Sequence, residues 1–140
     1  MSLLSKINSV SQLAAMFIAP IANLAGRLYV GWEFFKSGLL KLEDWDDTLE
    51  MFEDDWAIDF LPTQLSALLG TAGELVLPVL LFLGLFTRFG AAGLFVMVLV
   101  IECFIYPGTQ QHYYWMIILG MLVGYGGDKI SVDNLLLKRS

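Results

Sequence analysis

A long apolar stretch that carries three charges constrains this chain more than any other feature. The stretch runs from residue 20 to residue 41, and Arg27, Glu33 and Lys36 lie inside it. Crossing a membrane takes roughly 20 mostly apolar residues, so the stretch is long enough. A charged side chain at the centre of a bilayer costs about 3 kcal/mol on insertion scales, and such side chains usually face a bundle interior or a partner charge. The sequence therefore predicts further spans that shield these charges.

The composition places the chain among membrane proteins. Hydrophobic residues make up 57% of it and charged residues only 16%, and the mean hydropathy is +0.68, unlike an ordinary soluble domain. Lysine and arginine total eight and form no cluster, which excludes a nucleic-acid-binding surface. The single cysteine, Cys103, excludes an internal disulfide and a Cys-x-x-Cys redox pair. Residues 1–12 lack the pattern of a cleavable signal, so we expect the spans to direct membrane insertion.

Apolar segments with turn residues between them predict four membrane-spanning helices. The expected spans are residues 20–40, 62–86, 89–106 and 113–126. The short connections at 87–88 and 107–112 would make neighbouring spans antiparallel. The predicted fold is therefore all-α, a single membrane domain over residues 1–140 that forms an up-and-down four-helix bundle.

Two more helices are expected outside the spans. Apolar side chains recur every three or four residues from Leu3 to Phe17, which predicts an amphipathic helix in the membrane interface, and Pro20 would begin a separate helix. The first outer loop, Glu43 to Asp59, contains nine of the fourteen acids. Aromatic residues recur among these acids at helical intervals, which predicts a short helix on the bilayer surface. The loop lacks the glycine and the spacing of an EF-hand calcium loop.

The distribution of basic residues predicts the orientation of the chain. Basic residues on one side of the predicted topology are Lys6, Arg88, Lys129, Lys138 and Arg139. The acidic loop falls on the other side, where Lys41 is the only basic loop residue. By the positive-inside rule, both termini are expected to be cytoplasmic.

The charged residues of the spans are candidates for a polar site inside the membrane. With a rise of 1.5 Å per residue, Glu33, Glu74 and Glu102 share a depth of about 18 to 20 Å from the cytoplasmic boundary. Glu33 and Lys36 are spaced for mutual pairing on one helix, while Arg27 is expected to lean toward the cytoplasm instead of meeting Glu74. Two interpretations stay open. The charges pair to fix the packing, or one carboxyl without a cation holds a proton and serves as a relay.

His112 is the one histidine of the chain and falls at the outer mouth of the last two spans. A lone loop histidine is more often structural than catalytic. No second histidine is present to complete a transition-metal site with it, so we predict no metal. No complete catalytic constellation is found. The catalytic residues are therefore unknown, and we do not expect the chain to be an enzyme by itself.

Three groups of residues resemble the motifs of the DoxX family. They are Arg27-x3-Gly31-x3-Phe35-x2-Gly38-x2-Lys41, then Glu74 with Leu83-Gly84-Leu85-x-Thr87-Arg88, and finally Ser131-Val132-Asp133. The resemblance covers nearly the whole chain, and Asp128 departs from it because the family usually has glycine in that turn. The resemblance implies a four-helix bacterial inner-membrane protein. Its relatives include the small subunit of an archaeal thiosulfate:quinone oxidoreductase and membrane partners of redox-stress complexes.

The resemblance and the lack of a catalytic set favour one function. The leading hypothesis is a non-catalytic membrane subunit, or assembly partner, of a quinone-linked redox complex. No cofactor is evident in the motifs, but a quinone would lie against Trp32, Phe34, Trp115 and the region of Glu74.

Two alternatives belong to other classes of protein. The first is a small proton-coupled transporter with Glu33, Glu74 and Glu102 as its path, which would need a homo-oligomer because four spans are few for a carrier. The second is a structural protein whose acidic loop docks a periplasmic partner through salt-sensitive contacts.

Overall fold

The structure is a computed structural model that describes residues 2–138 of the chain. It contains six helices: α1 (Leu3–Glu43), α2 (Trp45–Asp54), α3 (Thr63–Leu83), α4 (Thr87–Phe104), α5 (Gln110–Tyr125) and α6 (Val132–Leu137). No strand occurs between residues 2 and 138, so the predicted all-α class is confirmed. Arg139, which contributed to the predicted orientation, lies outside the described residues.

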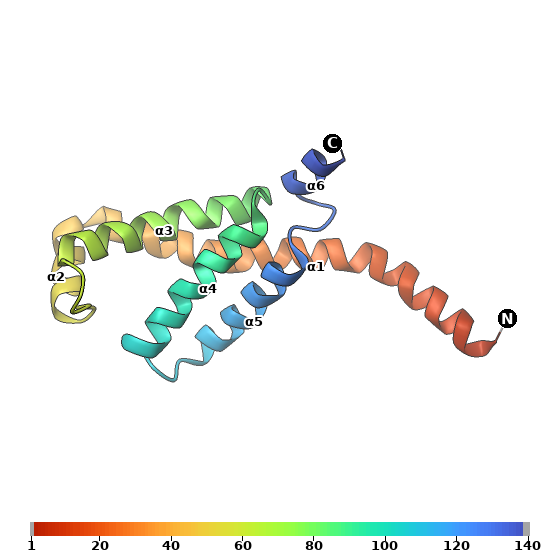
Figure 1. Ribbon diagram of the computed structural model, residues 1–140, viewed down its shortest axis with the longest axis horizontal. Coiled ribbons are helices and arrows are strands. Elements are labelled where there is room, and N and C mark those ends of the chain that lie inside the picture. Colours follow the sequence, from red (N-terminus) through yellow and green to blue (C-terminus); the bar gives the residue numbers. More distant parts are fainter. Residues whose placement is uncertain (1, 139–140) are drawn as a thin grey trace.

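The first helix is one continuous element of 41 residues, so the predicted break at Pro20 is wrong. Pro20 lies inside α1 and is buried. A proline removes one helical hydrogen bond, but apolar helices in membranes tolerate this loss because neighbouring groups compensate for it. Residues 3–19, expected as a separate interfacial helix, form the free end of α1 and project beyond the other helices (Figure 1).

Three helices are long and apolar enough to cross a membrane, namely α1, α3 and α4. The helix expected as the fourth span, α5, has 16 residues. At 1.5 Å per residue it is about 24 Å long, which is less than the hydrocarbon thickness of about 30 Å. The fourth span therefore stays a prediction.

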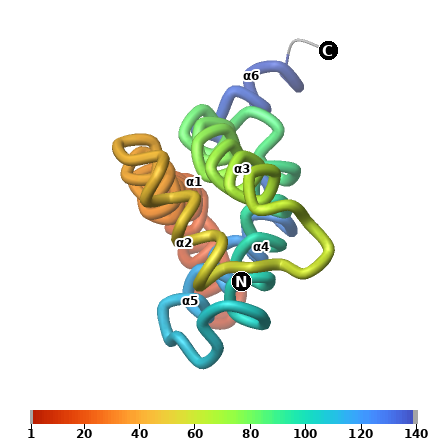
Figure 2. The backbone as a smooth tube through the Cα atoms, turned by 90° about the vertical axis from the view of Figure 1, so that its left-hand side faces the viewer, coloured from red at the N-terminus to blue at the C-terminus, as the bar shows by residue number. Residues whose placement is uncertain are grey.

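The long helices pack around a small apolar core. α1 packs on α3, α3 on α4, α4 on α5, and α5 also contacts α1 (Figures 1 and 2). The buried core residues are Val30, Phe34, Leu81, Ala91, Leu94, Val98, Leu119 and Leu122. Many large apolar side chains remain on the outside, which suits contact with lipid. The burial pattern therefore agrees with a membrane protein.

Two glycines of α1 permit the close approach of α3. A Cβ atom on Gly31 would lie 2.7 Å from the ring of Phe82, and one on Gly38 would lie 2.9 Å from Leu75. Real Cβ atoms avoid such distances, so these positions require the smallest side chain. Gly31 and Gly38 therefore let α1 and α3 approach each other closely.

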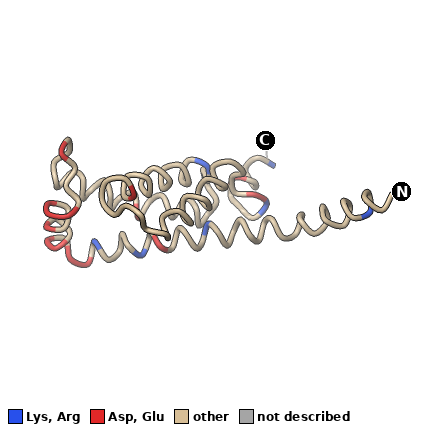
Figure 3. The backbone as a smooth tube through the Cα atoms, turned by 90° about the horizontal axis from the view of Figure 1, so that it is seen from below, with Lys and Arg blue, Asp and Glu red and all other residues tan. Residues whose placement is uncertain are grey.

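The predicted helix of the acidic loop is present as α2. Asp44 caps its first turn by accepting the N–H of Asp47 at 3.1 Å, as acidic residues do at helix N-termini. Thr48 and Phe52 are buried under it, whereas the nine acids from Glu43 to Asp59 are all exposed. Figure 3 shows the acids gathered at the end of the molecule that α2 covers. An apolar side therefore anchors α2, and its charged side faces outward.

Candidate functional site

The charged residues of the spans do not form the single cluster that their common depth suggested. No hydrogen bond or ion pair in the part of the chain that the structure describes joins Glu33, Glu74 and Glu102 to one another. The three carboxylates lie on different helices, and each has its own partners. The surroundings of each charge therefore decide what it can do.

Glu74 of α3 is paired with Lys41, near the C-terminus of α1. The Nζ atom of Lys41 lies 2.8 and 3.0 Å from the two carboxylate oxygens, and it also donates to Ser37 Oγ at 2.9 Å. The two side chains are only 8% and 4% exposed. The ammonium group also lies 4.9 Å from the centre of the Trp56 ring, close enough for a cation–π interaction.

Lys41 was expected in the outer loop, and that expectation is wrong. α1 continues to Glu43, so Lys41 lies on the helix and faces α3. A pattern in the sequence does point to this position. Arg27, Gly31, Phe34, Gly38 and Lys41 are spaced by four, three, four and three residues, which places them on one helical face. All five are buried.

A cavity of about 400 Å³ lies beside Glu74, between α2, α3 and α4. Apolar side chains form most of its wall, among them Phe52, Trp56, Leu69, Met97, Val100 and Ile101. Its polar residues are Glu74 and Ser66, and the buried Oγ of Ser66 has no hydrogen-bond partner within residues 2–138. Mostly apolar cavities of this size with a few polar groups commonly bind small amphiphilic molecules.

Trp56 is one of the aromatic residues that line this cavity. Its ring packs against Phe52 with centroids 5.1 Å apart and against Tyr106 at 6.1 Å. Its Nε1–H donates to the hydroxyl of Tyr106 at 3.4 Å, which joins the end of α2 to the residues that follow α4. The same ring thus contacts the Lys41 ammonium group and lines the cavity. Sequence reasoning treated Trp56 only as an interfacial aromatic.

Glu102 holds the loop between α4 and α5. Its carboxylate accepts the backbone N–H groups of Gly108 and Thr109 and the hydroxyl of Tyr113. It also lies 2.8 Å from Nδ1 of His112. A carboxylate at the first turn of α5 is favoured by the helix dipole. The structure therefore brings together Glu102 and His112, which the sequence singled out separately, in an arrangement that fixes a turn.

Arg27 is fully buried and binds carbonyl groups at one end of the bundle. Its guanidinium group donates to the carbonyl oxygen of Leu81, at 3.0 Å, and to that of Ile130, while Nε donates to Asn23. Leu81 lies in the last turn of α3, where its carbonyl oxygen also accepts the N–H of Gly84 at 3.2 Å. The C-terminal end of a helix attracts a cation. As expected, Arg27 does not meet Glu74. It satisfies the backbone at the end of α3 instead.

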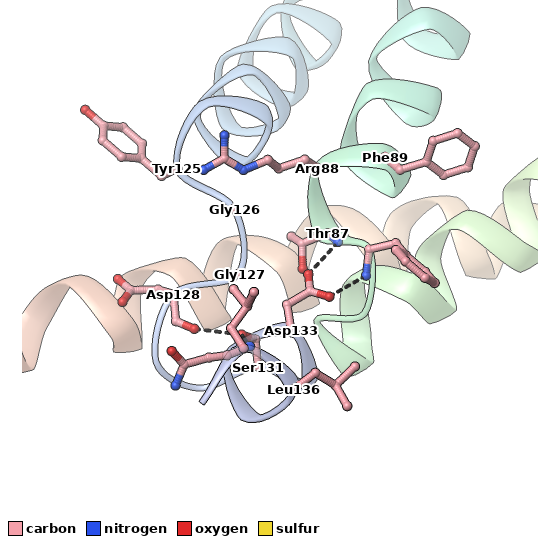
Figure 4. Close-up of a pocket in the computed structure, with 13 residues that line it drawn as sticks. Thr87, Arg88, Phe89, Tyr125, Gly126, Gly127, Asp128, Ser131, Asp133 and Leu136 are labelled. Atoms are coloured by element: carbon pink, nitrogen blue, oxygen red, sulfur yellow. Dashed lines mark hydrogen bonds between the residues drawn. The ribbon is translucent and has the colours of Figure 1, made fainter. Parts of the chain in front are cut away.

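Asp133, in the first turn of α6, connects this helix to the start of α4. Its carboxylate accepts the N–H groups of Phe86 and Thr87 at 2.8 and 2.9 Å, and its own N–H donates to Gly84 at 2.9 Å (Figure 4). Gly84 has φ of 67°, and a Cβ there would lie 2.5 Å from Arg27. The second and third sequence motifs thus meet in one joint, which we call the α4 joint, formed by residues 84–87 and 131–133.

The ion pair expected between Glu33 and Lys36 is confirmed, with a separation of 3.2 Å. Its location differs from the expectation, because the side chains are 26% and 47% exposed on the outer face of α1. Trp32, beside them, is exposed as well. These charges are not shielded inside the described helices.

The residues expected to contact a quinone do not line one pocket. Phe34 and Trp115 pack together near the core with ring centroids 5.3 Å apart, whereas Trp32 faces outward. Glu74 lies at the separate cavity described above. Within residues 2–138, no group of three histidine, cysteine or acidic side chains is arranged to hold a metal ion.

Comparison with known proteins agrees with the motifs. The sequence profile of the DoxX family matches residues 22–107, which include α1 from its bundle part onward, α2, α3 and α4. A protein of Haemophilus influenzae, described as uncharacterized, is 28% identical over 129 residues that cover 84% of this chain and 85% of that protein. No solved structure matches significantly. The chain is therefore a membrane protein that belongs to the DoxX family.

Proposed function

We propose that the protein is a non-catalytic membrane subunit of a quinone-linked redox complex and that it holds the lipid-soluble carrier beside Glu74. One observation carries this proposal. The cavity of about 400 Å³ combines an apolar wall with a buried, unpartnered Ser66 hydroxyl and a carboxylate fixed by Lys41. A quinone has a matching chemistry, because its ring and tail are apolar and its carbonyl oxygens accept hydrogen bonds.

The chain's own residues would bind and orient the carrier. Ser66 Oγ–H is available to donate to a carbonyl oxygen, and Leu69, Met97 and Val100 would contact the ring. Trp56 would help to exclude water from the cavity. A bound quinone would supply electron-transfer chemistry, and a partner protein would supply or take the electrons. Lys41 would keep Glu74 in place, so that the carboxylate does not compete for Ser66.

A binding measurement on matched variants tests this function. A short-chain quinone is titrated into the purified protein in detergent, and quenching of tryptophan fluorescence reports occupancy near Trp56. Val100 lines the cavity and Leu99, its neighbour, is exposed and does not. We expect Val100→Phe to weaken binding about tenfold or more, a loss near 1.4 kcal/mol, and Leu99→Phe to bind like the parent. Equal binding by the two variants, or none by the parent, would contradict the proposal.

The proposed placement is a multi-pass protein of the bacterial inner membrane with both termini in the cytoplasm and α5 as a short fourth span. The distribution of charge supports this placement. Lys6 lies on the projecting start of α1, Arg88 at the start of α4 and Lys129 after α5, and these segments lie away from α2 (Figure 1). The acids gather at the end that α2 covers (Figure 3). Replacing Cys103 by serine allows single cysteines at residues 6, 47 and 129 to report sidedness. We expect a membrane-impermeant thiol reagent to label only residue 47 in intact spheroplasts. Labelling of residue 129 would contradict the placement.

A second candidate is a docking function for α2. All nine acids of this region are exposed while Thr48 and Phe52 anchor the helix, so the charges can be removed without disturbing the core. Replacing Asp46, Asp47, Asp54 and Asp55 with asparagine should weaken salt-sensitive capture of a periplasmic partner. If the amount of partner captured changes neither with salt concentration nor with these substitutions, this candidate function is excluded.

The transporter alternative has less support, because Glu33, Glu74 and Glu102 each bind different neighbours. Flux of protons or solute in proteoliposomes that Glu74→Gln abolishes would restore it.

A further inference from the structure

A second candidate site lies at the end of the bundle opposite α2, where α4 begins and α5 ends. Two cavities, of about 620 and 510 Å³, meet there and share Tyr125 and Asp128. The larger lies in front of Thr87 and Arg88, at the α4 joint (Figure 4). The other is an apolar groove between α1 and α5, which we call the α1–α5 seam. Its walls include Ala19, Ala22, Gly26, Ile118 and Met121.

Arg88 provides an unused positive charge at this site. Its side chain reaches from α4 across the end of α5, beside Tyr125 in Figure 4, and its Nε lies 3.2 Å from the place that a Cβ on Gly126 would occupy. It is exposed and forms no hydrogen bond or ion pair with any residue from 2 to 138. Arginine in this state is well suited to bind a phosphate group through two N–H donors.

The two acids at the site are held by backbone groups. The Asp133 carboxylate accepts the N–H groups of Phe86 and Thr87, and Asp128 accepts the N–H of Lys129 at 2.7 Å. Neither is paired with Arg88. Thr87 is also among the residues that line the larger cavity, and its hydroxyl is fully buried and has no partner between residues 2 and 138. A buried hydroxyl without a partner is costly, so a ligand acceptor there would be favoured.

The surroundings indicate which kind of anion fits. Phe86, Phe89 and Tyr125 are exposed around Arg88, and aromatic side chains at the ends of membrane helices prefer the depth of lipid headgroups. Lys129 is exposed at the same end of the fold. The small side chains of the α1–α5 seam leave an apolar groove that continues from this polar region. A phosphate joined to an apolar chain matches both parts.

We propose that this end of the protein binds an anionic phospholipid, with its phosphate on Arg88 and one acyl chain in the α1–α5 seam. The site is independent of the quinone proposal, because its residues lie in different cavities from Ser66 and Glu74. It would fix the position of the joint that connects α3, α4 and α6 relative to the membrane surface.

The test compares lipids on the purified full-length protein. Phosphatidylglycerol, phosphatidylcholine with the same acyl chains, and inorganic phosphate are each added in neutral detergent. Thermal unfolding and lipid retained in native mass spectra are measured. We expect phosphatidylglycerol alone to raise the unfolding temperature and to be retained. Equal effects of phosphatidylcholine would overturn the proposal, and so would an equal effect of inorganic phosphate, since that result means an ion site without an acyl chain.

Matched variants locate the binding. Arg88→Gln should weaken phosphatidylglycerol binding about tenfold, the expected loss for a charge-assisted pair, while Lys138→Gln makes the same charge change and should not. Arg88→Lys keeps the charge and should bind phosphatidylglycerol with intermediate strength. This variant replaces Arg88→Gln in the test if the glutamine variant fails to fold. Ala22→Phe should block the seam and reduce retention without changing any charge. Equal losses in Arg88→Gln and Lys138→Gln, or unchanged binding in Arg88→Gln, would overturn the assignment.

Discussion

Two regions of the molecule bury a charged side chain from the same face of α1, and the two charges have different kinds of partner. At the α4 joint, Arg27 meets only carbonyl oxygens and an amide, while Asp133 meets only backbone N–H groups. At the end of the bundle that α2 covers, which we call the outer end, Lys41 contacts a carboxylate directly. Next to this pair lie a cavity and the Ser66 hydroxyl, which has no partner within residues 2–138. One face of one helix thus serves both ends of the bundle.

The difference teaches which of the two buried charges fixes the backbone and which lies beside space for a ligand. A charged side chain that forms its hydrogen bonds with backbone groups holds a turn in place, because carbonyl oxygens at a helix end need partners in any case. A charge pair beside unfilled space and a free donor has capacity left for a ligand. Substitutions of Arg27 or Asp133 should therefore change stability and leave quinone binding unchanged, whereas substitutions of Lys41 or Glu74 should separate stability from quinone binding.

The largest effect is expected from Glu74→Ala. It leaves the Lys41 ammonium group buried without its partner, at a cost of about 3 to 5 kcal/mol. Glu74→Gln retains a hydrogen-bond acceptor of similar shape and should recover part of that stability. Unfolding in a denaturing detergent measures both. If Glu74 also contributes to the ligand site, the glutamine variant should fold and still bind quinone less tightly.

The pair can also be removed as a whole. Replacing Lys41 with methionine and Glu74 with leucine together should restore most of the stability lost in Glu74→Ala, since well-packed apolar residues often replace a buried ion pair without loss. Quinone binding, measured by fluorescence, should stay weak. Parent-like binding by this double variant would show that the outer end is as structural as the joint.

The next effect in size concerns Asp133. Asp133→Ala leaves the N–H groups of Phe86 and Thr87 without acceptors, which should cost about 1 to 3 kcal/mol. Quinone binding at the distant cavity should not change once the protein is folded. Asp128→Ala makes the same change in charge but removes only the contact with the N–H of Lys129, so it provides the control for charge. A loss of quinone binding in Asp133→Ala would break the division between the two ends.

The face of α1 was readable from the sequence, but most of what it contacts was not. Arg27, Gly31, Phe34, Gly38 and Lys41 recur at helical spacing, and the close approach at the glycines follows from their size. Lys41 was nevertheless placed in a loop, because the acids after it hid the continuation of α1. Pro20 was interpreted as the start of a helix, but α1 continues without a break on both sides of it.

Contacts between distant parts of the chain were beyond the reach of the sequence alone. Asp133 caps α4 from 46 residues away, and Glu102 reaches the turn before α5. The motifs around Thr87 and Ser131 indicated that these segments matter without indicating that they touch. The cavity beside Glu74 depends on how α2 folds back over α3, which local periodicity does not determine.

The smallest effect is expected at Asp128, where the chain departs from the usual glycine of the family. Asp128 has φ of 54°, a left-handed conformation that costs an ordinary residue about 1 kcal/mol relative to glycine. Asp128→Gly relieves this strain. It also removes the contact of the carboxylate with the N–H of Lys129 and raises the conformational entropy of the unfolded chain, and both changes oppose the gain. The carbonyl oxygen that accepts from Ser131 is retained in either case.

We expect a net gain in the free energy of unfolding of about 0.5 kcal/mol for Asp128→Gly, and a loss for Asp128→Ala, which keeps the strain and removes the contact. Unfolding curves of the two variants in one detergent decide. Equal stability of glycine and alanine there would mean that the backbone relaxes out of the left-handed region, and the turn would then not contribute to the rigidity of the α4 joint.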